Sequence, residues 1–177
     1  MKSRFYLSLL FFIFSLQAPA QSLDIKTTSQ YHSPGKLSLK YEYYFNFWEE
    51  REIYHGRYEK WAVNGSKVYS ASYHHGNKDG LETYFTKNGL VSRKIRWRNN
   101  RIHGSWQSFY PNGKQKEIYL YVEGEKEGLF QVFHKTGTLK QEGNFNKGLA
   151  NGLFSYYDKS GQMKKQILFK QGKRIKQ

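Results

Sequence analysis

Glycine recurs along this sequence at a fixed interval of twenty-four residues, and that interval constrains the fold more than any other feature. A leading glycine opens each of five successive units, and a second glycine follows nine residues later. These ten structural repeat positions are Gly56, Gly65, Gly80, Gly89, Gly104, Gly113, Gly128, Gly137, Gly152 and Gly161. A period of this size predicts a repeat array in which each unit buries its apolar residues on its neighbours.

Aromatic residues keep the same period. One stands five residues after each leading glycine: Trp61, Phe85, Phe109, Phe133 and Tyr157. Another stands seventeen residues after it: Tyr73, Trp97, Tyr121, Phe145 and Phe169. Twenty residues after the leading glycine, four units have another glycine. The remaining unit, which is the second, has Asn100, and asparagine is the residue type that best tolerates positive φ after glycine. Each unit therefore predicts a β-hairpin and a connecting turn. We expect an all-β fold, an elongated and twisted antiparallel meander of hairpins in a single sheet.

The chain divides into three parts. Residues 1–20 have a basic start, an apolar run and a small-x-small end, which predicts a signal peptide and a mature start at Gln21. Residues 21–55 form a polar N-terminal segment with one or more degenerate capping strands, since residues 37–45 alternate in polarity. Five repeats follow, at 56–79, 80–103, 104–127, 128–151 and 152–175. We expect an exported protein that is periplasmic, envelope-associated or secreted.

One proline sets the expected turn register. In the third repeat, Pro111-Asn112-Gly113 favours a type I turn with Gly113 at a left-handed bulge position, hence a three-residue loop. The first-strand aromatic then pairs with the residue two beyond the turn glycine. With regular alternation, one face of the second repeat holds Leu81, Phe85, Val91, Ile95 and Trp97, and the other holds Glu82, Tyr84, Lys94, Arg96 and Arg98.

The second of these faces gives the candidate binding patch. The net charge is +15, which favours anionic partners. Lys94, Arg96 and Arg98 share one face of a strand, and no acidic residue occurs between Glu82 and Glu117. The expected patch consists of Tyr84, Lys94, Arg96, Arg98, Trp106 and Ile118.

Catalytic and cofactor chemistry find no support in the sequence. The chain has no cysteine, and it has no nucleophile triad, phosphate loop or metal motif. Six histidines are present, but adjacent residues such as His74 and His75 should point to opposite faces of a strand. We therefore predict no catalytic, cofactor-binding or metal site, and no enzyme activity.

The repeat pattern resembles the MORN repeat in its bacterial variant form, as in the YwqK-type antitoxin components. The resemblance covers residues 56–175 and rests on the glycine and aromatic columns. It implies an extended sheet of hairpins used for attachment to membranes, lipids or proteins.

Three functions stay open. The preferred one is an exported, non-catalytic scaffold that binds a protein or an anionic lipid or polysaccharide of the cell envelope. Nucleic acid is disfavoured as a partner because the protein is expected to be exported. The second, implied by the resemblance, is an intracellular antitoxin-like protein that neutralises a toxin. The third is a cell-wall carbohydrate-binding module, suggested by a looser likeness to aromatic, glycine-rich choline-binding repeats. The sequence leaves the oligomeric state open.

Overall fold

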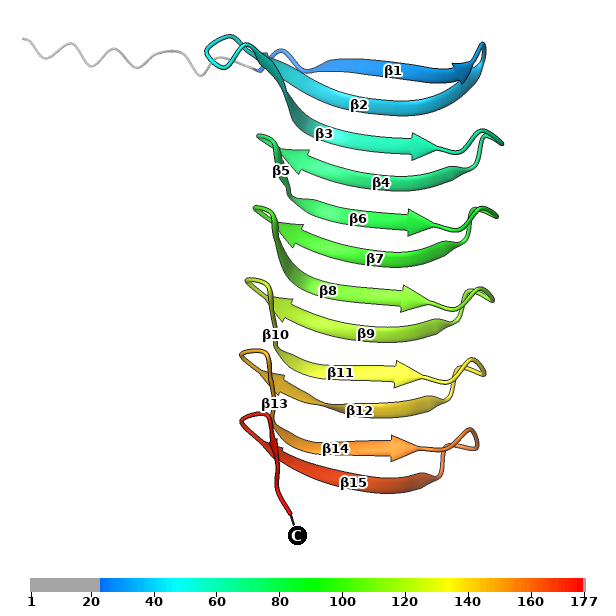
Figure 1. Cartoon of the computed structure of the whole chain (residues 1–177), viewed down its shortest axis with the longest axis vertical. Coiled ribbons are helices and arrows are strands. Elements are labelled where there is room, and N and C mark those ends of the chain that lie inside the picture. The colour runs from blue at the N-terminus through cyan, green and yellow to red at the C-terminus, as the bar shows by residue number, and fades with distance from the viewer. Residues whose placement is uncertain (1–22, 177) are drawn as a thin grey trace, which may run out of the picture.

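The computed structural model describes residues 23–176, so the expected signal peptide lies outside the described part. The described chain forms one sheet of sixteen strands and contains no helix. Sequential strands pair antiparallel, so the chain runs as a meander from one end of the sheet to the other (Figure 1). The strands are β1 (Lys26–Ser33), β2 (Lys36–Asn46), β3 (Arg51–Trp61), β4 (Lys67–His74), β5 (Asn77–Lys78), β6 (Gly80–Phe85), β7 (Val91–Arg98), β8 (Arg101–Phe109), β9 (Gln115–Val122), β10 (Glu125–Lys126), β11 (Gly128–Phe133), β12 (Leu139–Asn146), β13 (Leu149–Ala150), β14 (Gly152–Tyr157), β15 (Met163–Lys170) and β16 (Lys173–Arg174). The predicted all-β hairpin meander is confirmed.

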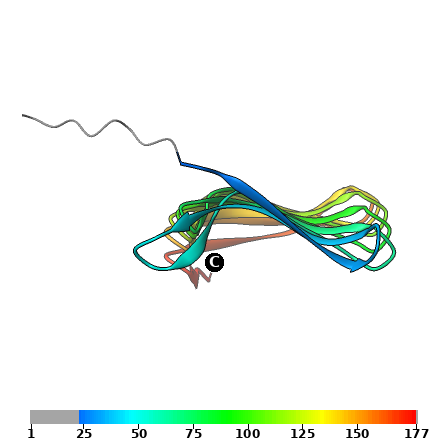
Figure 2. The ribbon, with the colours of Figure 1, turned by 90° about the horizontal axis from the view of Figure 1, so that it is seen from above.

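The sheet has no second layer among the described residues. Seen along its long axis, the hairpins overlay one another with a gradual rotation, as expected of a twisted sheet (Figure 2). The sheet also extends further toward the N-terminus than the polar composition of residues 21–34 suggests, because β1 pairs with β2 from Lys26 onward. No helix that could cross a membrane occurs within residues 23–176.

Both turn types agree with the sequence. In the second repeat the Gly89 N–H donates to the Thr86 carbonyl at 2.9 Å, and Phe85 pairs with Val91, which is the predicted three-residue loop. The turn that ends each repeat has two residues of positive φ, for example 46° at Asn99 and 63° at Asn100. This is a type I′ turn, and it needs glycine or asparagine at its second position. Asn100 therefore replaces glycine for the predicted reason.

The expected faces are wrong after the turn, and a bulge is the cause. Phe85 pairs with Val91, but its neighbour Tyr84 pairs with Arg93, so Ser92 is an extra residue in β7. The extra residue moves everything after it to the opposite face. Ile95 consequently pairs with Glu82, and it lies on the face of the sheet opposite to Phe85. The same shift occurs in all five repeats.

Candidate binding surface

One face of the sheet, which we call the ladder face, carries a line of aromatic side chains along its length. In its N-terminal half the rings of Tyr58, Tyr69 and Tyr84 follow one another with centroids 5.1–6.1 Å apart. In its C-terminal half Phe130 lies 5.1 Å from Phe154, which lies 4.7 Å from Phe169. Such tilted and edge-on contacts between neighbouring strands stabilise a single-layer sheet, which has no second sheet to cover it.

A buried ion pair interrupts the ladder in the second repeat. Glu82 stands in the column that holds Phe130 and Phe154 in later repeats, and only 1 % of it is exposed. Its carboxylate forms an ion pair with Lys78 and accepts hydrogen bonds from the Tyr69 hydroxyl at 2.6 Å and the Trp97 indole at 2.9 Å. Burial raises the pKa of Tyr69, and the bond to Glu82 raises it further, so that hydroxyl remains a donor. Glu82 is therefore fully partnered and serves the ladder.

A shallow groove lies on the ladder face next to this ion pair. It is lined almost entirely by tyrosine: Tyr54, Tyr58, Tyr69, Tyr73 and Tyr84, together with Lys60. Burial, the leading cause in each case, raises the pKa of Tyr54, Tyr73 and Tyr84, so these hydroxyls stay protonated at neutral pH. Sequence reasoning missed this groove because it placed position seventeen of each repeat on the same face as position five.

The opposite face, which we call the reverse face, holds the expected cations. Lys94, Arg96 and Arg98 alternate along β7 on this face, and Leu81 of β6 pairs with Arg96. None of the three cations forms an ion pair with any residue in the range 23–176. A carbon atom added to Gly104 would lie 2.9 Å from the Arg96 Cδ, so this glycine leaves room for the Arg96 side chain to lie over the backbone.

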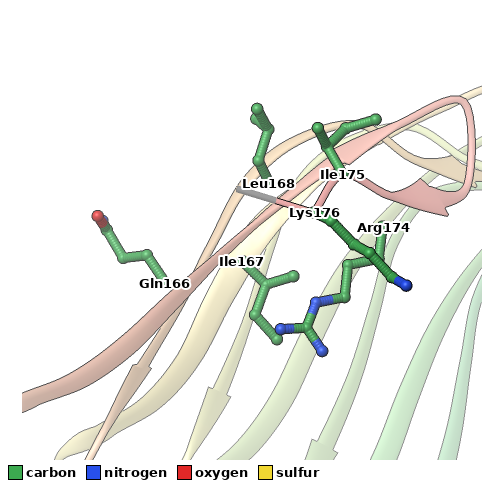
Figure 3. Close-up of a pocket in the computed structure, with 6 residues that line it drawn as sticks. All are labelled: Gln166, Ile167, Leu168, Arg174, Ile175 and Lys176. Carbon is green, nitrogen blue, oxygen red and sulfur yellow. The ribbon is translucent and has the colours of Figure 1, made fainter.

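Exposed leucines continue the reverse face toward the C-terminal half. Leu120, Leu129 and Leu153 are 43 %, 45 % and 50 % exposed, and each occupies the same row of the sheet as Arg96. The row ends at the last strands, where Figure 3 shows Leu168 and Ile175 together on one side of the ribbon. The reverse face thus has a basic part on β7 and an aliphatic stripe below it.

The structure divides the expected patch between the two faces. Lys94, Arg96, Arg98 and Ile118 lie on the reverse face, with Ile118 paired to Gln107 in the same row as Lys94. Tyr84 and Trp106 lie on the ladder face, where the Arg93 guanidinium stacks on both rings at 5.3 and 5.8 Å. The six residues therefore do not form one surface. The bulge at Ser92 is the physical reason for this correction.

The histidines also differ from expectation. His75 is the first residue of a type I′ turn, with φ of 47°, so the alternation of a strand does not apply to it. The rings of His74 and His75 lie 4.3 Å apart, and each lies 4.9 Å from the ring of His55. The argument that His74 and His75 diverge is wrong.

The geometry defines a class of protein, an all-β hairpin-repeat protein with two chemically different faces. Comparison with known families agrees: the model of the MORN repeat variant matches residues 102–123, 126–147 and 150–171. These are three consecutive MORN repeat variants, and the matched segments keep the twenty-four-residue period. The match starts at residue 102, two residues before the third repeat, and does not reach β1 to β7.

The other comparisons add little. No match was found among curated proteins. Among solved structures, a mutant of S. aureus TarM in complex with fondaparinux, α-GlcNAc-glycerol and UDP is 14 % identical, with a TM-score of 0.30. The match covers 70 % of this chain and 22 % of that chain. A score this low carries no argument about fold or activity.

Proposed function

We propose that this protein is an exported, non-catalytic scaffold that docks on an anionic surface of the cell envelope through its reverse face. The observation that carries the proposal is the arrangement of Lys94, Arg96 and Arg98 on one strand, without acidic partners among residues 23–176, beside a stripe of exposed leucines. Cations attract anionic head groups, and aliphatic side chains gain from leaving water at the same surface. The matched MORN repeat variants support a binding scaffold, and the leader-like residues 1–20 support export.

Vesicle binding tests this proposal directly. The protein is sedimented with vesicles of zwitterionic lipid and with vesicles that contain one third anionic lipid, at low and high salt. We expect binding to the anionic vesicles only, weakened by salt because screening shortens the range of the attraction. The triple variant K94E/R96E/R98E should lose this binding and keep the circular dichroism of the parent.

A matched variant controls for net charge. K87E/K135E/K159E changes the charge by the same amount at three exposed turn positions. It should retain most of the binding. Equal loss in both variants would show that overall charge, and not the reverse face, attracts the vesicles. No binding by the parent protein would overturn the lipid surface and leave a protein partner to be sought.

Export is tested separately. N-terminal sequencing of the protein recovered from its native cell should give a start near Gln21. An intact Met1 in the cytoplasm would favour the alternative, an intracellular toxin-neutralising protein.

The tyrosine groove favours a second candidate function, carbohydrate binding. Aromatic rings with protonated hydroxyls present apolar faces and hydrogen-bonding groups side by side, which suits sugar rings. Titration with soluble cell-wall fragments, read by tyrosine fluorescence, tests it. A response that is lost in Y69A/Y73A and kept in K94E/R96E/R98E would assign the sugar to the ladder face.

A further inference from the structure

Three histidines at the N-terminal end of the sheet bring their ring nitrogens together. His55 lies on β3, His74 ends β4, and His75 begins the turn between β4 and β5. One nitrogen from each ring lies within 4.8 Å of the others. His55 is half-buried, whereas His74 and His75 are exposed, so an ion from solvent can reach the cluster. We propose that this cluster binds a late first-row transition metal ion, and we expect this ion to be Zn²⁺.

The chemistry of the cluster fits this class of ion. Neutral imidazole is a preferred ligand of Zn²⁺, and three imidazoles leave a fourth tetrahedral position for water. Nitrogens bound at about 2.0–2.1 Å around a tetrahedral ion stand roughly 3.3 Å apart. The rings must therefore close by about 1–1.5 Å, and the two exposed rings can do so by rotating about their side-chain bonds.

Neighbouring groups position His75 and its turn. The Tyr44 hydroxyl lies 3.2 Å from Nδ1 of His75, and a metal ligand of this type usually has such a partner on its second nitrogen. The turn is tied to β3 because the Gly76 N–H donates to the Tyr54 carbonyl at 2.8 Å.

The repeat itself explains one of these histidines in another way. In the first four repeats the residue before the leading glycine accepts a hydrogen bond from the first backbone N–H of the type I′ turn, for example His55 from His75 at 3.4 Å and Glu127 from Lys147 at 2.7 Å. His103 makes the same contact with Glu123 at 3.5 Å, and it has no second histidine nearby. This turn contact accounts for His55 but not for His74 and His75. Metal binding must therefore replace the 3.4 Å hydrogen bond between the His75 N–H and His55.

Other repeats provide substitutions that the fold accepts. Asparagine stands at the position of His55 in the last repeat boundary (Asn151), at that of His74 in the fourth repeat (Asn146) and at that of His75 in the second (Asn99). The variants H55N, H74N and H75N therefore remove an imidazole and keep a side chain that occurs in the same structural position. H103N is the matched control, because it changes the equivalent position two repeats along.

Calorimetric titration of the full, untagged chain with Zn²⁺ is the experiment. We expect one ion per chain and at least a tenfold loss of affinity in each of H55N, H74N and H75N, with no change in H103N. The Co²⁺ form should show the visible absorption of a tetrahedral ion, and Zn²⁺ should raise the melting temperature of the parent but not of H75N. Absence of saturable Zn²⁺ binding, or equal binding by parent and cluster variants, would overturn the site. Equal loss in H103N would show binding by scattered surface histidines.

Discussion

The Trp97 indole Nε1 donates a hydrogen bond of 2.9 Å to Oε2 of Glu82, a carboxylate buried among aromatic rings. Lys78, whose side chain is 26 % exposed, balances the charge and also lies 4.9 Å from the Trp97 ring. This polar centre joins β5, β6 and β7 in a position where the fourth and fifth repeats have Phe130 and Phe154.

Removal of Lys78 should be the most damaging single change at this centre. K78M leaves the Glu82 carboxylate buried without its counter-ion, and breaking such a pair costs about 3 kcal/mol of unfolding free energy. The double variant K78A/E82F copies the last repeat boundary, where Ala150 and Phe154 occupy these positions. It should recover most of the loss in urea unfolding. A double variant no more stable than K78M would show that the ion pair is not the source of the stability.

Acid should weaken the same centre. Burial alone would raise the pKa of Glu82, but Lys78 and the hydrogen bonds of Tyr69 and Trp97 hold this pKa below its usual value of 4.5. The folded state therefore binds this proton less readily than the unfolded state, and the stabilisation is present above about pH 4.5 and is lost as the pH falls below it. Unfolding free energy measured from pH 7 to pH 3 should fall less steeply for E82Q than for the parent. E125Q, at an exposed position of β10, should keep the parent slope; equal slopes in all three proteins would contradict the assignment.

Sequence reasoning succeeded where one residue type meets one backbone requirement. Asn100 and the repeated glycines stand at positive φ, and Pro111 indicated the three-residue loop that all five repeats adopt. Period and turn chemistry together therefore predicted the hairpins and the single sheet. These features depend on local geometry, which a sequence displays directly.

The candidate site was less predictable because faces depend on every residue between two points of a strand. The bulge at Ser92 has no distinctive residue type: the same position holds Val68, Lys116, Lys140 and Lys164 in the other repeats. One signal was available. Regular alternation places the Trp97 column away from Glu82, whereas the observed register brings the indole within reach of that carboxylate. A cross-strand search for partners of the buried acid could have found the shift.

Gly143 should resist replacement although glycine is a poor strand residue. It lies between two rings of the ladder, and an added Cβ would stand 2.7 Å from Phe154 and 2.9 Å from Phe130. G143A should therefore lose about 1–3 kcal/mol, since the rings must move apart. The control is A71G, at the same position of the first repeat, which removes a methyl group without crowding and should cost no more than about 1 kcal/mol. Strand propensity alone predicts the opposite sign for G143A, so a stabilised variant in chemical denaturation would refute the crowding argument.

Asn100 should be better than glycine at its own position, although four repeats have glycine there. Its Oδ1 accepts a hydrogen bond from the Lys78 N–H at 2.7 Å, and its Nδ2 donates to Asn77 at 2.6 Å. N100G relaxes the positive φ of 63° but loses both bonds, each worth about 1 kcal/mol. We expect a net loss of roughly 1 kcal/mol in urea unfolding. The reciprocal variant G124N should gain at most the bond to a backbone N–H, because Arg101 stands where Asn77 would have to be to accept the second bond. An N100G protein as stable as the parent would mean that positive φ alone decides which residue occupies this turn.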